Sequence, residues 1–206
     1  MLLTKTLTSF FLMAVVAVTA ENAVFSRSLG VSRVLKLVDD GTVDTVIFGA
    51  LLGAVEMIAG VLAFFLQKFL LDPYLPANWL SPLRPLSMVL CTVAAFWAVL
   101  LICMKAAPAG RLRPVLDVLP MAAFNTCVLG VLYITTRQGF TLAETLGFAL
   151  GSAAGYVLAV LVVTEGQRKL QGRAVPQAFR GLPANLIYIG ILALAIYAFT
   201  GHMVLI

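Results

Sequence analysis

Residues 45–66 read TVIFGALLGAVEMIAGVLAFFL, a continuous apolar run in which Glu56 is the only charged side chain. The hydrocarbon core of a bilayer is about 30 Å thick, and a helix needs about 20 mostly apolar residues to cross it. Because this run has that length and composition, it predicts a helix that spans a membrane.

The rest of the chain is similarly apolar. Of its 206 residues, 62% are hydrophobic and only 11% are charged, and the mean hydropathy is +1.04. An ordinary soluble domain has about 45–50% apolar and about 25% charged residues, so the composition excludes a soluble globular enzyme. The net charge of +5 reflects few acidic residues rather than a basic patch, and it does not indicate binding to nucleic acid. We expect an integral membrane protein whose surroundings are the lipid bilayer.

Apolar stretches of membrane-spanning length occur six times along the chain, separated by segments that hold most of the prolines and charges. They predict an all-α protein that forms a single membrane domain over residues 1–206. The expected spans are Leu7–Phe25, Thr45–Leu66, Leu86–Met104, Val115–Thr135, Leu142–Val163 and Ala184–Phe199, with Ile206 as an alternative end of the last.

The N-terminal segment permits two interpretations. Lys5, an apolar run and Val18-Thr19-Ala20 together resemble a secretory signal with a small-residue cleavage site. The run is long for a signal, and it leads into a motif at Asn22, so we expect this segment to be retained.

Lysine and arginine are distributed unequally between the two sets of loops. The loops after the first, third and fifth expected spans hold ten of the 14 basic residues, and the opposite side holds four. Because positively charged loops remain in the cytoplasm, both termini are expected to face outward.

The two halves of the chain resemble each other. Residues 49–54 read GALLGA and residues 147–152 read GFALGS, while Asn22-Ala23-Val24-Phe25 has a counterpart in Asn125-Thr126-Cys127-Val128. With three spans in each half, the second half (residues 106–206) would be inverted relative to the first (about residues 1–105). Inverted repeats are common in transporters, whose functional groups lie where helices break. Chance recurrence of small residues is the alternative.

Three kinds of residue within the expected spans suggest specific roles. Glu56 is either a protonatable ion site or a neutral acid hydrogen-bonded to a neighbouring helix. Asn22 and Asn125 either cap helix breaks or form interhelical hydrogen bonds worth about 1 kcal/mol. Glycines spaced four residues apart predict close packing of the second and fifth spans, against each other or against a partner. These glycines are Gly49 and Gly53 in one span and Gly147, Gly151 and Gly155 in the other.

The cysteines do not form a recognisable metal motif. Cys91 and Cys103 are about 18 Å apart along one expected helix, too far to share a metal or a disulfide. Cys127 lies in the fourth span. No nucleophile triad, phosphate-binding loop or paired carboxylate site is visible, so we expect no catalytic residue in this chain.

Three stretches resemble one family, the six-helix membrane subunits of the Rnf and Nqr ion-translocating electron-transport complexes, and most closely the RnfA/NqrE type. They are residues 22–33 (NAVFSRSLGVSR), the segment from Pro120 to Asn125 with VLGV at 128–131, and the loop before the last span. The loop contains Val175-Pro176 and Ala178-Phe179-Arg180-Gly181, and it is the most specific of the three.

The resemblance implies a non-catalytic component of a prokaryotic cytoplasmic-membrane complex, with broken first and fourth helices. It also implies a paralogous RnfE/NqrD-like partner, other Rnf/Nqr subunits, and a shared [2Fe–2S] cluster to which each partner supplies two cysteines. Electrons passing through that cluster would be coupled to sodium or proton movement.

The sequence departs from the family pattern at the ligand positions. Leu29-Gly30 continues directly into Val31-Ser32, where the family has a short stretch containing its first ligand cysteine, and Cys127 is one position later than expected. Cys127 remains the candidate metal ligand. The alternative function is a small transporter, or an assembly or scaffold subunit, that lacks redox chemistry.

Overall fold

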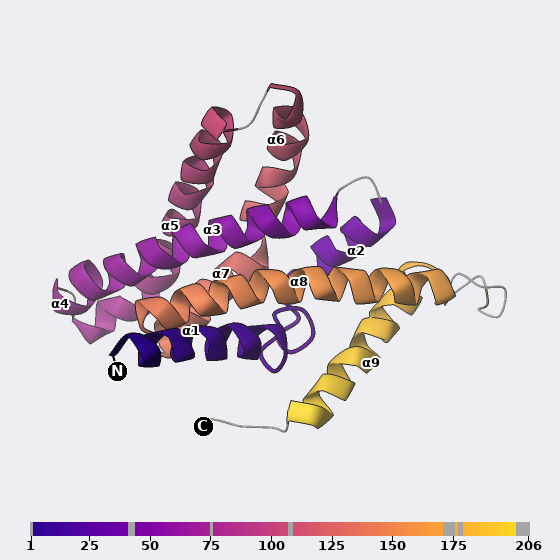
Figure 1. Ribbon diagram of the computed structural model, residues 1–206. Coiled ribbons are helices and arrows are strands. Elements are labelled where there is room, and N and C mark those ends of the chain that lie inside the picture. The colour runs from indigo at the N-terminus through magenta and orange to yellow at the C-terminus, as the bar shows by residue number, and fades with distance from the viewer. Residues whose placement is uncertain are drawn as a thin grey trace.

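A computed structural model describes residues 2–40, 44–74, 76–106, 109–170, 176 and 179–200 (Figure 1). These residues form helices joined by short loops, without a strand among them. The suggested extension of the last span to Ile206 lies outside the described residues. The helices are α1 (Leu2–Val18), α2 (Val31–Asp40), α3 (Thr45–Leu66), the π-helical turn η1 (Gln67–Leu71), α4 (Asp72–Tyr74), α5 (Ala77–Ala106), α6 (Ala109–Ala123), α7 (Thr126–Arg137), α8 (Leu142–Leu170) and α9 (Leu182–Thr200).

Three of these helical segments are long and apolar enough to cross a membrane: Thr45–Tyr74, Pro82–Lys105 and Leu142–Leu170. The pair Val115–Ala123 and Thr126–Arg137, bent by 45°, is a fourth if it counts as one broken span. The first and last apolar helices, Leu3–Val18 and Leu182–Ala198, are shorter. Each expected apolar stretch thus contains a helix or a helix pair, while a total of six spans remains a prediction.

One expected boundary was wrong. The first stretch was expected to continue to Phe25, but its helix ends at Val18. The Asn22 side-chain amide donates a hydrogen bond to the carbonyl of Val18. In a continuing helix this carbonyl would accept from the backbone N–H of Asn22, so the side chain takes the place of that N–H. Apolar residues continue beyond this point, and hydropathy alone therefore does not reveal the end of the helix.

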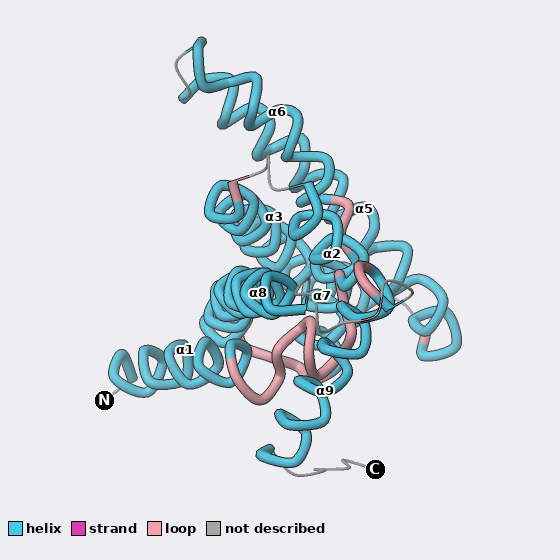
Figure 2. Tube along the Cα trace, turned by 90° about the vertical axis from the view of Figure 1, so that its right-hand side faces the viewer, coloured by secondary structure: helices cyan, strands magenta, loops and turns pink. Residues whose placement is uncertain are grey.

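Helices α3 and α8 lie antiparallel at the centre of the molecule, and Figure 2 shows them nearly end-on, with α1 on one side and α6 on another. A Cβ built on Gly49 would overlap the side chain of Val157, and one on Gly53 would lie 3.0 Å from Cβ of Ala153. The two backbones therefore approach closely at these glycines, as small residues permit within membranes. The expected packing of the second span against the fifth is present.

The other three glycines face a different helix. Cβ atoms on Gly147 and Gly151 would overlap the carbonyl oxygens of Phe10 and Ala14, and one on Gly155 would lie 3.2 Å from the carbonyl oxygen of Ala17. Along α8 from Gly147 to Gly155, the neighbouring residues of α1 run from Phe10 to Ala17, so α1 runs parallel to α8. Each glycine pattern indicated a close packing face, but the spacing did not reveal that the two faces have different partners.

The helix pairings are consistent with two related halves. Helix α1 packs on α8, and α6 packs on α3; likewise α9 packs on α8, and α5 packs on α3. Each central helix also contacts the segment beyond the break, since α7 packs on α3 and α2 packs on α8. The inverted repeat and its division near residue 105 remain predictions.

The close approach of α1 to α8 makes Gly151 sensitive to a single added methyl group. Its neighbour is a backbone carbonyl, so Gly151→Ala forces the two helices apart, and we expect a loss of about 1–3 kcal/mol in the free energy of unfolding. Gly190→Ala is the control, because a Cβ there meets nothing within 4 Å. The measurement is unfolding of the detergent-solubilised protein, followed by circular dichroism during titration with sodium dodecyl sulfate. Equal midpoints for the two variants would contradict the α1–α8 contact.

Candidate functional site at two helix breaks

The first helix break, between α1 and α2, is organised by Asn22. Its Nδ2 donates to the carbonyl oxygens of Val18 at 3.0 Å and Gly155 at 3.1 Å. Its Oδ1 accepts from the backbone N–H groups of Val24 at 3.0 Å and Phe25 at 3.2 Å. One buried amide therefore partners four backbone groups, three near the break and one in α8. These hydrogen bonds satisfy backbone N–H and carbonyl groups, because leaving such groups unpaired in an apolar environment costs free energy.

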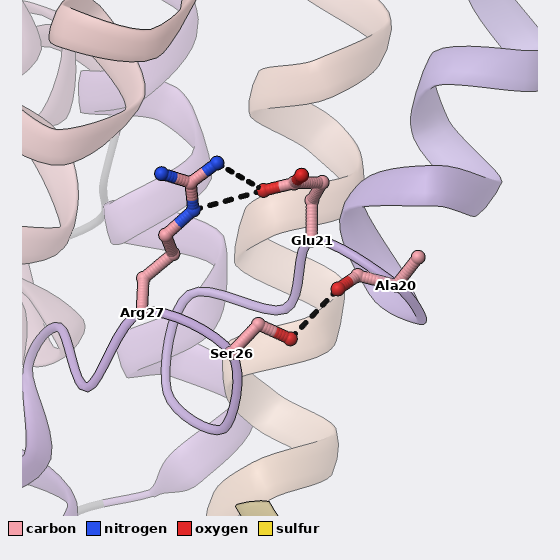
Figure 3. Close-up of polar contacts among 4 residues, drawn as sticks. All are labelled: Ala20, Glu21, Ser26 and Arg27. Carbon is pink, nitrogen blue, oxygen red and sulfur yellow. Dashed lines mark hydrogen bonds and ion pairs between the residues drawn. The ribbon is translucent and has the colours of Figure 1, made fainter. Parts of the chain in front are cut away.

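The loop that follows is closed by short-range polar contacts (Figure 3). Nε and Nη2 of Arg27 donate to Oε2 of Glu21 at 2.9 and 2.7 Å, and Oγ of Ser26 donates to the carbonyl of Ala20 at 2.7 Å. Figure 3 shows Arg27 and Glu21 pointing toward each other across the loop. The pair brings opposite charges together on a part-exposed loop, although such a pair contributes little stability by itself.

The second break, between α6 and α7, is centred on Asn125. This residue is extended (φ −104°, ψ 140°), and its Oδ1 accepts from the backbone N–H of Cys127 at 3.1 Å. Asn125 therefore caps α7, as asparagine commonly does at helix N-termini. Both asparagines thus lie at the breaks that the sequence predicted. Nδ2 of Asn125 is buried and has no hydrogen-bond partner among the described atoms.

The two breaks meet at Gly30. The Gly30 N–H donates to Oγ1 of Thr126 at 2.8 Å, and the Gly30 carbonyl accepts from the hydroxyl of Tyr156 at 2.9 Å. Gly30 has φ +70°, and a Cβ there would lie 2.6 Å from Cε2 of Tyr156 and 2.8 Å from Oδ1 of Asn125. Both conformation and space therefore require glycine. The residue ties the first break to the second break and to α8.

A polar group formed by three helices lies beside this junction. Oγ of Ser152 in α8 lies 3.5 Å from Oε1 of Glu56 in α3 and 3.4 Å from Sγ of Cys127 in α7. Glu56 is fully buried, and its Oε2 has no partner among the described atoms. None of the ion pairs between described side chains includes Glu56. Because burying an unpaired charge is costly, the neutral acid is the form that this site accommodates at least cost.

The described residues do not fit a shared [2Fe–2S] cluster. Such a cluster is held by four ligands, usually cysteine thiolates. The first break carries no cysteine, and the Cys127 thiol is fully buried and lies against Ser152. Cys127 is thus a single thiol at the second break, whereas the resemblance implies two thiolates from each partner. We therefore assign no electron-transfer step to these residues, and metal ligation by Cys127 remains untested.

The loop motif forms the entrance to α9. The Phe179 N–H donates to the carbonyl of Pro176 at 3.0 Å, and Gly181, with φ +82°, accepts from the N–H of Asn185 at 3.1 Å. Arg180 lies between them in the turn, and Phe179 is exposed. Two further residues of the motif, Val175 and Ala178, lie outside the described part of the chain.

Sequence reasoning singled out Asn22, Asn125, Glu56 and Cys127, and these residues lie in or beside the two breaks. It missed Thr126, Ser152 and Tyr156, which connect them. The available signal was that Ser152 and Tyr156 are polar, lie in a highly apolar stretch and are four residues apart, so that they share a helix face.

These features define a class: an integral membrane protein in which irregular backbone at the level of the helix middles is buried against neighbouring helices. The chain belongs to the Rnf-Nqr family of membrane subunits, since the family described as "Rnf-Nqr subunit, membrane protein" matches residues 10–203. This result confirms the resemblance seen in the sequence.

Curated relatives are similar over nearly the whole chain. The A-type subunit of the ion-translocating oxidoreductase complex of Syntrophotalea carbinolica is 31% identical over 195 residues, which cover 94% of this chain and 97% of that protein. The A-type subunit of the Na(+)-translocating ferredoxin:NAD(+) oxidoreductase complex of Acetobacterium woodii is 30% identical over 197 residues, covering 95% and 98%. The corresponding protein of Cereibacter sphaeroides is 37% identical over 123 residues, covering 59% and 63%.

Proposed function

We propose that this chain is the A-type membrane component of an ion-translocating oxidoreductase complex in a bacterial cytoplasmic membrane. In this role it has no catalytic residue of its own and pairs with a paralogous RnfE/NqrD-like six-helix subunit. Family membership and near-full-length similarity to proteins with that name support the proposal. The charge distribution between loops supports an orientation with both termini outward.

The observation that carries the pairing is the junction of the two breaks at Gly30. Its inner side is packed against α8, but on its outer side Phe124, which precedes Asn125, is 52% exposed. A cavity of about 140 Å³ adjoins this side, lined partly by Thr92 and by Asn125, whose Nδ2 has no partner among described atoms. Non-helical backbone at membrane depth is tolerated where protein or a water-filled cavity covers it. A partner helix that packs over the second break would provide such cover.

Co-purification tests the pairing. The chain, with an affinity tag, is co-expressed with its six-helix paralogue and the remaining subunits from the same genome. We expect the untagged paralogue to elute in a stable complex. Phe124→Gln should weaken retention of the paralogue at least about tenfold, as expected when a buried aromatic anchor is lost. Leu194→Gln is the matched control, because Leu194 is an exposed apolar residue on α9.

Two results would contradict this proposal: a paralogue that never elutes with the chain, or equal losses in the Phe124 and Leu194 variants. The same preparations test the role of Cys127. Because the described residues do not fit a cluster, iron and acid-labile sulfide in the complex should be unchanged by Cys127→Ala. Stoichiometric iron that disappears in this variant would establish Cys127 as a ligand.

A second function is favoured by the buried carboxyl. We propose Glu56 as a protonatable group on an ion pathway, which would suit a small transporter without redox chemistry; in a purely structural scaffold Glu56 would have no such role. The supporting observation is its unpartnered Oε2 beside Ser152 and Cys127, where three helices meet. Cys91 on α5 and Tyr156 on α8 are titratable side chains of helices that pack against α3, and neither is a cation.

Reaction with dicyclohexylcarbodiimide tests this role, because the reagent modifies protonated carboxyl groups in apolar surroundings. We expect Glu56 to be labelled in membranes, more slowly as the pH rises, and more slowly with added sodium if the carboxylate binds that ion. Peptide mass spectrometry locates the label. Glu56→Gln should abolish labelling, and the control Glu144→Gln should retain it, because Glu144 caps the start of α8 through Thr141. No labelling of Glu56 at any pH would refute an accessible ion site.

A further inference from the structure

We propose that a polar cavity at one end of the bundle binds the phosphate group of an anionic phospholipid. The cavity has a volume of about 490 Å³ and lies between the end of α3 with η1, the start of α5, and the turn that joins α7 to α8. This inference is independent of the proposed pairing and of Glu56. The lining residues on which it rests are Gln67, Lys68, Asp72, Arg84, Gly139 and Thr141.

The charged lining residues leave an excess of positive charge. Oδ1 of Asp72 is already engaged, since it accepts from Nε2 of Gln67 at 2.7 Å and lies 3.6 Å from Nη2 of Arg84. Lys68 lies over the ring of Phe64, 5.4 Å from the ring centroid, and none of the ion pairs between described side chains includes it. Two cations thus line the cavity with one carboxylate, and a second carboxylate, Glu144, adjoins it but already accepts from the N–H and hydroxyl of Thr141. The two lining cations favour an anion as the occupant.

Arg84 provides the most specific indication of a ligand. Its Nε is buried and has no hydrogen-bond partner among the described atoms. Buried donors are almost always paired in native proteins, and leaving one unpaired is costly. The guanidinium group presents parallel N–H donors that match two oxygens of a phosphate. The Arg84 side chain is 29% exposed, so a phosphate in the cavity would accept from the exposed part of its guanidinium group, and Lys68 would add a second positive charge.

Irregular backbone builds the walls of this cavity. Gln67 and Lys68 belong to the π-helical turn η1, a feature that is rare and frequently found at functional sites. Arg84 lies between Pro82 and Pro85 inside α5, and its carbonyl accepts from Oγ of Ser87 at 2.7 Å. Prolines within a helix remove backbone hydrogen bonds and distort it. Two distorted helices thus place their cationic side chains at the same cavity.

The surroundings favour a lipid as the source of the phosphate. Phe65 at the end of α3 and Phe69 and Leu70 in η1 are exposed, and the rings of Phe65 and Phe69 stack with centroids 5.9 Å apart. Phe65 and Phe69 directly follow the lining residues Phe64 and Lys68 in the sequence, so acyl chains could extend from a headgroup in the cavity toward them. Cationic side chains near helix ends commonly contact headgroups in this way.

Native mass spectrometry of the delipidated protein in detergent tests the proposal. The probes are dioleoyl phosphatidylglycerol, dioleoyl phosphatidylcholine and inorganic phosphate. We expect phosphatidylglycerol to bind at least about tenfold more tightly than phosphatidylcholine, and Arg84→Gln and Lys68→Gln each to weaken that binding about tenfold. Arg137→Gln should leave it unchanged, because Arg137 lies at the end of α7 over Tyr133 and is not among the residues that line the cavity.

Equal binding of the two lipids would overturn the proposal, and so would equal losses in the Arg84 and Arg137 variants. Inorganic phosphate binding that depends on Arg84 and Lys68, without a preference for phosphatidylglycerol, would support a phosphate site but overturn the lipid as its source. If Arg84→Gln fails to fold, the decision rests on the wild-type lipid comparison and on Lys68→Gln, whose side chain is exposed.

Discussion

The structure depends on the backbone of Gly30. Its N–H donates to a side chain of α7, and its carbonyl accepts from a side chain of α8. Each hydrogen bond contributes only about 1 kcal/mol. Their importance is that irregular backbone in an apolar environment must be satisfied by neighbouring groups, since water is absent. Loss of the Thr126 hydroxyl would leave the buried Gly30 N–H unpaired, whereas the Gly30 carbonyl also accepts from the backbone N–H groups of Arg33 and Val34. The junction therefore fixes the first break against the second and holds both against α8.

Close helix packing supports this junction. Gly147, Gly151 and Gly155 allow α1 to approach α8 so closely that the amide of Asn22 reaches the carbonyl of Gly155. Gly49 and Gly53 bring α3 to the other side of α8, which places Glu56 beside Ser152. Glycine spacing, helix breaks and the buried carboxyl are consequently parts of one arrangement.

Much of this fold could be predicted from the sequence because membranes impose simple rules. Hydropathy located the apolar helices, and asparagine within apolar runs identified both breaks, because an amide can bond the backbone groups that a break frees. Spacing along a helix defines a face but not its neighbour, so the contact of Gly151 with α1 was not predictable. The roles of Thr126 and Tyr156 were also hidden, since they depend on Gly30, which is distant in the sequence.

The candidate site has two helix breaks with a carboxyl, a hydroxyl and a single thiol beside them. Asn22 and Asn125 lie at the two breaks, the first break carries no cysteine, and Cys127 lies against Ser152 and near Glu56. A carboxyl, a hydroxyl and a thiol can exchange protons, whereas an iron–sulfur cluster requires several thiolates. This chemistry supports the proposal that the buried polar groups handle protons or ions rather than electrons.

A disulfide cross-link tests the junction of the two breaks most directly. A Cβ on Gly130 would lie 3.4 Å from Cγ of Leu29, so cysteines at these two positions should be within bonding reach. In a background with Cys91, Cys103 and Cys127 replaced by alanine, Leu29→Cys with Gly130→Cys should cross-link rapidly in membranes under mild oxidation. Leu29→Cys with Gly190→Cys should remain reduced. Failure of the first pair to cross-link, or equal cross-linking of both pairs, would contradict the meeting of the two breaks.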